Sequence, residues 1–461
     1  MTKTASSDSA SRREAIISAP IGSTLFKLTV PMLYALLAIM GLGIVDSYFI
    51  SFLGTQELAA MGFVVPIAFT MTSVSLGLGM AISTLTSKLI GANKYSLAAR
   101  LITDGFYLTF FVSVLLSALL AWQLEPIFSL IGADKDTMPA IMAYMNTWLV
   151  GCVFLMLTQA CSSTFRAIGD TKTSALISIV LTVVNIVLDP ILIFGIGPIP
   201  SMGMQGAALA TVFAVVISTL MAFYFLGVKE KLILTALPQW QLFKENLSNL
   251  LSIAIPAVLA NAIVPITGAV LTSFVAVYGA DAVAGFGVGG RIEAVSLIIT
   301  YALSATIPAF IGQNLGADNK ARVAEAIRIS FSFVFFAQLI IYVLLAAFSV
   351  QISYLFSNET AVQNVIQLFL WVIPASYGLS SMVILTNVAM NVLGKPKIAL
   401  YINLARLVII YLPLTVIGGY LFELKGIFIG ISIGNVMAFG LSFYLLVATL
   451  KGLKITLIRA K

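Results

Sequence analysis

The sequence predicts an all-α, polytopic membrane protein with twelve transmembrane helices in two pseudo-symmetric six-helix lobes. Three observations support this fold class: the composition, the recurrence of long apolar segments and an internal duplication. Of the 461 residues, 60% are hydrophobic and only 9% are charged, whereas soluble domains are nearly half apolar and a quarter charged. A transmembrane β-barrel would instead show short segments of alternating hydrophobicity.

The long apolar segments recur along the whole chain, and each is long enough to cross a bilayer as a helix. The N-terminal stretch 1–23 is polar and lacks the pattern of a secretory signal, so we expect it to form a cytosolic tail. The twelve predicted spans cover residues 25–53, 59–87, 101–123, 138–164, 173–197, 203–227, 249–277, 283–311, 326–350, 362–390, 398–420 and 424–448.

The lysines and arginines predict the orientation of these spans, because basic residues concentrate on the cytosolic side. If the N-terminus is cytosolic, only Lys135 and Lys425 fall in outer loops, and Arg291 and Arg406 lie within spans. Every other lysine and arginine then falls on the cytosolic side. This distribution predicts that both termini are cytosolic and that the number of spans is even.

The two halves of the chain resemble each other at one fixed spacing, hereafter the duplication offset, which is the mark of a repeat. The matching pairs are VPMLYALLA at 30 with IPAVLANAI at 255, FLGTQELAAMGF at 52 with VYGADAVAGFGV at 277, LIGANK at 89 with NLGADN at 314, and AIGDTK at 167 with VLGKPK at 392. We therefore expect an N-terminal lobe over 1–227, a charged cytosolic linker over 228–248 and a C-terminal lobe over 249–461. Two such lobes around a central cleft are typical of a transporter.

Two carboxylates lie in apolar spans of the first lobe and are missing from the second. Asp46 corresponds to Leu271 at the duplication offset, and Asp189 corresponds to Leu414. A charged, unpaired carboxylate in a membrane costs several kcal/mol, and intramembrane acids are commonly functional. No lysine or arginine lies within the first-lobe spans to neutralise them. The alternative is a buried neutral acid that merely bonds a nearby amide or carbonyl.

The positions of the acids in their helices predict that they lie at one depth. Asp46, Asp189 and Thr211 are each eight residues from an outer-loop glycine, or roughly 12 Å below the outer surface at the rise of an α-helix. Asn185 lies one turn from Asp189 on the same helix face. These groups could share a proton or hold Na⁺ with oxygen ligands. We expect H⁺ or Na⁺ as the coupling ion, and no cofactor.

Other residues are candidates for a hinge or for the wall of a substrate cavity. Gly41, Gly43 and Pro190 could make the helices that carry the acids bendable, although the two glycines could equally serve close helix packing. The cavity candidates, for which packing is the alternative, are Tyr34, Met61, Gln159, Met204, Arg291 and Glu293. The two cysteines, Cys152 and Cys161, fall on opposite helix faces and are expected to be buried thiols.

With Asp46 late in the first helix, NIVLDP in the fifth, GAALAT opening the sixth and GGRIEA in the eighth, the chain resembles the multidrug and toxic compound extrusion (MATE) family, in its DinF-like prokaryotic branch. The resemblance covers all twelve spans. It implies a monomeric antiporter in a bacterial or archaeal cytoplasmic membrane that exports bulky, amphipathic, often cationic drugs by alternating access. It also implies that the carbonyl of Ala207 joins the cation site and that the first helix bends when its acid is protonated. Another bacterial branch carries acids in its seventh and tenth helices, whereas the corresponding segments of this chain, 249–277 and 362–390, contain no acid.

Other classes of function fit the sequence less well. A flippase for lipid-linked oligosaccharides, from the related superfamily, needs a strongly cationic cleft, which the first lobe lacks. An intramembrane aspartyl protease would show G-x-G-D, and an ATP-driven pump would show a phosphate-binding loop; neither pattern occurs. The basic glycine motif of major-facilitator transporters is also missing. We therefore expect no enzymatic activity and no binding to nucleic acid, and we expect contact with the lipid bilayer and with small molecules.

Overall fold

The computed structural model of the protein describes residues 7–235 and 239–456. Within these ranges the regular structure is helical and no strand occurs. Ten helical segments are long and apolar enough to cross a membrane, and an eleventh is formed by a pair that bends by 45° at one residue. The predicted all-α membrane fold is therefore confirmed.

The first half of the chain, residues 7–235, forms six long helices and two short ones. All six predicted spans of this half are present, with ends that differ by a few residues. The helices are α1 (Ser7–Ser18), α2 (Ile21–Ser51), α3 (Thr55–Gly91), α4 (Tyr95–Trp122), α5 (Leu124–Leu130), α6 (Met138–Ala167), α7 (Thr171–Phe194) and α8 (Gly203–Tyr224), which continues into a π-helical turn, η1 (Phe225–Lys229).

The second half, residues 239–456, repeats this order of helices with more breaks. Its elements are α9 (Trp240–Ala276), α10 (Ala280–Ser296), α11 (Ile298–Gly316), α12 (Lys320–Ala347), α13 (Ser349–Phe356), α14 (Thr360–Val372), the 3₁₀ turn η2 (Pro374–Ser376), α15 (Tyr377–Val392), α16 (Pro396–Ala405), the π-helical segment η3 (Arg406–Tyr411) and α17 (Leu412–Gly452). The bent pair of α10 and α11 is the predicted eighth span.

The last long helical segment is a hairpin of two spans, which brings the number of spans to twelve. The backbone of α17 leaves the helical region at Phe422 and Glu423. On either side of that break the chain runs back along itself, because Gly418 packs directly against Gly426 and Gly430 packs against the carbonyl of Leu414. Only glycine lets two helix backbones approach so closely.

The duplication is visible in the backbone conformation of the turns. Gly54, Asn93 and Gly169 have positive φ angles of 148°, 60° and 82°. Their counterparts at the duplication offset, Gly279, Asp318 and Gly394, have positive φ angles of 98°, 58° and 79°. Left-handed backbone is uncommon and tolerated best by Gly, Asn and Asp. Three equivalent turns with the same special conformation therefore confirm the register of the repeat.

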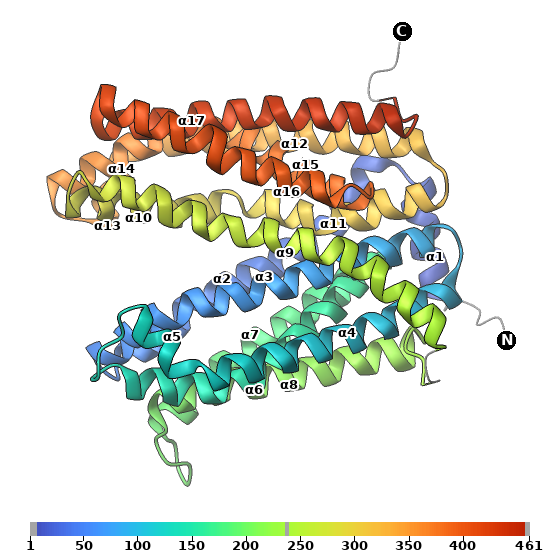
Figure 1. The fold of residues 1–461 in the computed structure, drawn as a ribbon, viewed down its shortest axis with the longest axis horizontal. Coiled ribbons are helices and arrows are strands. Elements are labelled where there is room, and N and C mark those ends of the chain that lie inside the picture. Colours follow the sequence, from blue (N-terminus) through green and yellow to red (C-terminus); the bar gives the residue numbers. More distant parts are fainter. Residues whose placement is uncertain (1–6, 236–238, 457–461) are drawn as a thin grey trace.

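Both termini lie at the same end of the molecule, hereafter the termini end (Figure 1). Helices α2–α8, blue to green, form one group, and α10–α17, yellow to red, form the other, with α9 between them (Figure 1). The groups touch because α3 packs against α9 and α11, and α2 packs against α11. At the termini end Gly91 lies against the backbone of Gln313, and Gly316 lies against the carbonyl of Lys88.

From the sequence we expected residues 1–23 to form a cytosolic tail. Within the described part of this segment, Ser7–Ser18 instead forms helix α1, which lies across the termini end. Ile16 is only 2% exposed and packs with apolar side chains of α11 and α12. Arg13 donates hydrogen bonds to the carbonyls of Ile90 and Gly91 at the end of α3. The burial of Ile16 and the hydrogen bonds of Arg13 thus hold α1 against the rest of the protein, although its composition is polar.

Candidate functional site

Asp46, Asn185 and Asp189 meet in the first half, on two helices that pack side by side. Asp46 projects from α2, and Asn185 and Asp189 lie one turn apart on α7. With the Asn185 amide in the orientation that gives both of its ends a partner, its nitrogen donates to Asp46 Oδ1 at 3.0 Å and to Asp189 Oδ2 at 3.1 Å. One amide nitrogen therefore joins the two acids, which holds the carboxyl groups close to each other. Two negative charges at such close range are unfavourable, so the arrangement favours one proton on the pair.

The oxygen of the Asn185 amide is turned away from the acids, toward α8. It accepts from the backbone nitrogen and from Oγ1 of Thr211, both at 3.1 Å. Thr211 Oγ1 lies 3.3 Å from the carbonyl oxygen of Ala207, one turn earlier on α8. The structure therefore brings together all five residues that the sequence analysis selected for the cation site.

Tyr144 of α6 is a member of this cluster that the sequence analysis missed. Its side chain is only 7% exposed and lies near Thr211 and both acids. Tyr144 lies six residues inside the start of α6. The depth argument used for Asp46, Asp189 and Thr211 counts eight residues from an outer-loop glycine, and it does not select Tyr144, which lies twelve residues after Gly132.

The cluster contains acids and neutral groups, without a basic partner. Asn185 and Asp189 are each 1% exposed. Among the described residues, no lysine or arginine forms an ion pair with Asp46 or Asp189. An enclosed carboxylate without a counter-charge must take up a cation from solution or carry a proton. The arrangement can therefore bind and release a small cation.

The predicted hinge residues flank this cluster. A methyl group at Gly41 or Gly43 would meet no neighbouring atom within 4 Å, so close helix packing does not explain these two glycines in this conformation. Both α2 and α7 are helical throughout, and α7 continues through Pro190. Bending at these positions stays a prediction.

The predicted cavity residues are scattered over the molecule. Tyr34 is 61% exposed, Arg291 is exposed, and Met61 and Gln159 are half-buried. Met204 is 5% exposed and belongs to the hydrophobic core of the first half. Glu293 alone among the six lines a cavity that the structure delineates, a space of about 380 Å³ in the second half between α9, α10, η3 and α17.

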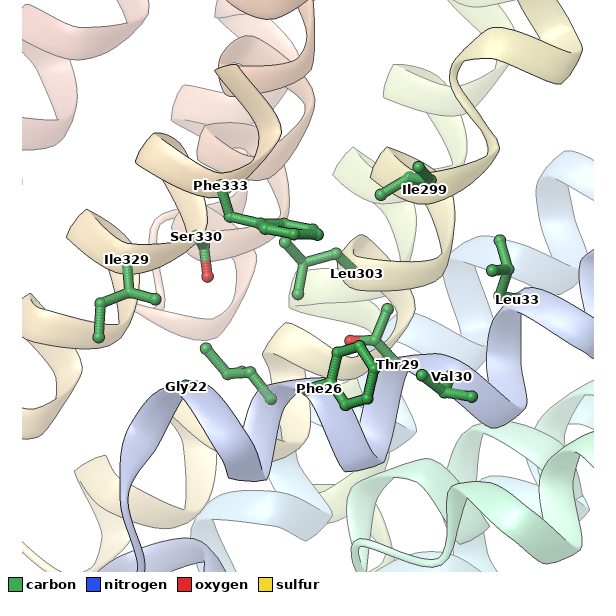
Figure 2. A pocket seen from close by; sticks show the side chains of 11 residues that line it. Gly22, Phe26, Thr29, Val30, Leu33, Ile299, Leu303, Ile329, Ser330 and Phe333 are labelled. Atoms are coloured by element: carbon green, nitrogen blue, oxygen red, sulfur yellow. The ribbon is translucent and has the colours of Figure 1, made fainter. Parts of the chain in front are cut away.

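A second hollow of about 320 Å³ lies between α2, α11 and α12. Figure 2 shows Phe26 of α2, Leu303 of α11 and Phe333 of α12 around it. Its lining includes Thr29 and Ser330 but no charged side chain. This hollow is therefore suited to apolar groups and not to an ion.

Comparison with known proteins gives the family. The model of the MatE family matches twice, over residues 31–191 and 256–417. The chain belongs to the MatE transporter family. The two matched stretches begin at positions 31 and 256, in the register of the duplication, so each half of this MatE transporter is one copy of the family unit.

The relatives of this MatE transporter are named as transporters of small molecules. It is 37% identical to an FAD transporter of Shewanella oneidensis, over 94% of this chain and 96% of that protein. It is 27% identical to the multidrug export protein MepA of Staphylococcus saprophyticus, over 87% of each chain. The crystal structure of the Vibrio cholerae MATE transporter VcmN in the bent form matches with a TM-score of 0.89 and 29% identity, over 96% of this chain and 98% of that one. The chain is therefore a transporter and not an enzyme.

Proposed function

We propose that this MatE transporter is a proton-coupled antiporter that exports bulky amphipathic molecules by alternating access between its two halves. In this proposal Asp46 and Asp189 form the coupling site, and Asn185, Thr211, Tyr144 and the carbonyl of Ala207 position them. Protons entering from outside neutralise the acid pair, and their release to the cytosol resets it.

The neighbours of Asn185 carry the choice of a proton over Na⁺: the backbone nitrogen of Thr211, which can only donate, lies on one side of the amide and the two acids lie on the other, so the amide nitrogen is assigned to the acid side. This nitrogen faces both acids at 3.0 and 3.1 Å, while the amide oxygen is engaged by Thr211. An amide N–H₂ group pointing at two carboxyl groups repels a metal cation between them but stabilises a singly protonated pair. Binding Na⁺ would require the amide to turn over and Thr211 to release it.

The positions of the basic residues support a cytosolic location for the termini end. The turns and helix starts at this end carry Lys88, Lys94, Lys172, Lys320 and Lys397, as the positive-inside rule requires of cytosolic segments. We therefore infer a multi-pass protein of the cytoplasmic membrane, acting as a monomer. Since α1 and the glycine contacts join the halves at this end, the conformation described here is closed toward the cytosol.

Two substrate classes are supported by relatives, and the choice between them is part of the test. The MepA relatives favour amphipathic, often cationic drugs. The FAD transporter of Shewanella oneidensis, with its higher identity and nearly full coverage, favours a flavin dinucleotide. Both are bulky, partly aromatic molecules. A flippase for lipid-linked oligosaccharides is the third alternative.

Transport into everted membrane vesicles tests the proposal, with ethidium and FAD as separate fluorescent substrates. A lumen-acidic pH gradient without Na⁺ should drive accumulation, and an inward-directed or outward-directed Na⁺ gradient alone should not. Asp46→Asn should reduce pH-driven accumulation by at least about tenfold, whereas Asp281→Asn, an exposed acid on α10, should retain it. Accumulation driven by Na⁺ alone, or an unchanged Asp46→Asn variant, would show that the coupling site is misassigned.

A further inference from the structure

The second half contains a charged group that the coupling site does not use. Arg406 begins the π-helical segment η3 and lines the 380 Å³ cavity of the second half. The corresponding residue of the first half, at the duplication offset, is Leu181. Arg406 is therefore specific to the second half, just as the acid pair is specific to the first.

The guanidinium of Arg406 is held by neutral oxygens. Nη2 donates to Asn435 Oδ1 at 2.6 Å, to Ser380 Oγ at 3.0 Å and to the hydroxyl of Tyr411 at 2.5 Å, and Nε donates to that hydroxyl at 2.9 Å. The Tyr411 ring also lies beneath the guanidinium, with 5.0 Å between the ring centre and Cζ. Asn435 is fixed in turn by Ser376, to which its amide nitrogen donates at 2.8 Å.

This network holds the direction of the arginine through neutral groups alone. No ion pair involves Arg406 among the described residues, and no hydrogen bond found there uses its Nη1. A guanidinium keeps its proton in proteins. Glu293 lines the same cavity and acts on Arg406 through its charge, but the described residues show no ion-pair contact between the two. A fixed, charged donor on the wall of a cavity is the arrangement that recognises a carboxylate or phosphate.

The depth of Arg406 excludes a lipid head group as the anion. Arg406 is ten residues from the start of α16 at Pro396 and sixteen residues before the break at Phe422. These separations correspond to about 15 Å and about 24 Å along the helix, which places the guanidinium near the middle of the membrane. An anion that reaches this depth must be brought there by a transported molecule.

We infer that the second-half cavity is an anion subsite, in which Arg406 binds a phosphate or carboxylate group of an amphipathic substrate. This inference rests on the proposed function, because it concerns the molecule that the antiporter carries. A volume of about 380 Å³ lies in the range of small-molecule pockets. Phe286, Ile263 and Ile431 line the same space, so an aromatic or aliphatic part of the substrate can lie beside the anion. The transporter should then favour anionic amphiphiles over purely cationic ones.

Flavins provide a matched set of probes, because riboflavin, FMN and FAD share one ring system and differ in phosphate. We would titrate purified full-length protein in detergent with each flavin and follow fluorescence anisotropy, without any ion gradient. The wild type should bind FMN and FAD about tenfold or more tightly than riboflavin, as one charge-assisted hydrogen-bonded contact implies. Arg406→Gln should lose this preference while its riboflavin affinity stays within about twofold.

Two further variants keep the test decisive if Arg406→Gln does not fold. Glu293→Gln removes the negative charge that shares the cavity, so it should increase the preference for FMN over riboflavin. Arg291→Gln removes an exposed arginine from α10 that does not line the cavity, and it should leave the preference unchanged. A wild type with no preference for FMN, or a preference that survives in Arg406→Gln, or one that falls in Glu293→Gln, would overturn the inference.

The same binding assay separates this inference from the proposed coupling. Asp46→Asn should abolish pH-driven transport but keep the FMN-to-riboflavin preference, since Asp46 lies in the other half. If a pH gradient does not drive transport but the preference for FMN over riboflavin is intact, the proton mechanism alone is rejected. Normal pH-driven transport without any flavin preference would reject the anion subsite alone.

Discussion

Removal of the arginines that attach α1 should open the termini end of the transporter. Arg13 of α1 donates to the carbonyl of Gly91 at 2.7 and 3.1 Å and to that of Ile90 at 3.0 Å. Arg322 of α12 donates to the carbonyls of Ile16 and Ala19 at 3.1 and 2.7 Å. The first arginine joins α1 to the first half, and the second joins it to the second half. Arg12 adds an ion pair to Glu230 of the first half at 2.7 Å, and Asn314 of the second half donates to the carbonyl of Ile16 at 3.2 Å. Helix α1 is therefore a bridge between the halves, with several bonds at each end.

The magnitude follows from the type of hydrogen bond. Bonds to a charged donor contribute about 1.5–3 kcal/mol each, and both arginines face carbonyls at helix C-termini, where a positive charge is favoured. Because the arginines are partly exposed and regain water when released, we take about 2 kcal/mol for each. That corresponds to a change of roughly thirtyfold in the ratio of closed to open molecules. Each variant weakens one end of the bridge, and opening breaks only the weaker end, so Arg13→Ala and Arg322→Ala combined should do little more than the more effective one alone.

Pulsed electron paramagnetic resonance between spin labels can measure this ratio. Labels at Lys94 and Lys397, two exposed positions on opposite halves at the termini end, would be introduced after replacing the two buried cysteines, Cys152 and Cys161. Each arginine variant should add a population with a longer distance, and Lys172→Ala, an exposed lysine at the same end, should not. Unchanged distances, or effects of the two variants that simply add, would refute the bridge.

Three further predictions address the packing, the acid cluster and an outer loop. Gly316→Ala should lower the free energy of unfolding by about 1–3 kcal/mol, because a Cβ at this position overlaps the carbonyl of Lys88. The change should appear as a lower midpoint of thermal unfolding. Gly43→Ala is the control, because its Cβ meets no atom within 4 Å and the midpoint should stay the same. Tyr144→Phe removes the hydroxyl beside Thr211 and should slow pH-driven transport several-fold, while Tyr48→Phe, an exposed ring on α2, should transport normally. Hydrogen bonds from the side chain and backbone of Thr137 hold the pKa of Asp134 below its ordinary value. This contact therefore stabilises the loop at any pH above the pKa that Asp134 has in the unfolded chain. The stabilisation is lost as the pH falls through the lower pKa that Asp134 has in the folded protein. Amide exchange at Thr137, corrected for intrinsic rates, should accelerate on acidification in the wild type but not in Asp134→Asn.

Most of this fold is predictable from the sequence, because a helix that crosses the bilayer must be long enough to span it and apolar along that length. The turns were predictable as well, since Gly54 and Gly279 mark equivalent positions in the repeat. The structure of α1 was not predictable from composition. Its docking depends on one buried isoleucine, Ile16, and on arginines that bond to backbone carbonyls far away in the sequence.

The acid cluster was predictable to the extent that it follows from depth within helices. Asp46, Asp189 and Thr211 were found in this way, whereas Tyr144 lies twelve residues from the outer-loop Gly132 and does not follow the rule. The orientation of the Asn185 amide was beyond the sequence, because it depends on which neighbour lies on each side of the side chain. The setting of Arg406 was equally hidden, because its partners Ser380 and Asn435 come from helices that are distant in the chain.

The glycine contacts at the termini end have the form of a twofold interface. Gly91 of α3 meets Gln313 of α11, and Gly316 of α11 meets Lys88 of α3; at the duplication offset, these are the same contact made twice with the roles exchanged. Residue i meeting j while j meets i is the signature of an isologous dimer. The seal between the halves is thus pseudo-twofold, with each half contributing the equivalent pair of residues. A larger residue at Gly91 should therefore meet the same difficulty as one at Gly316, because a Cβ at either position overlaps a backbone carbonyl of the other half.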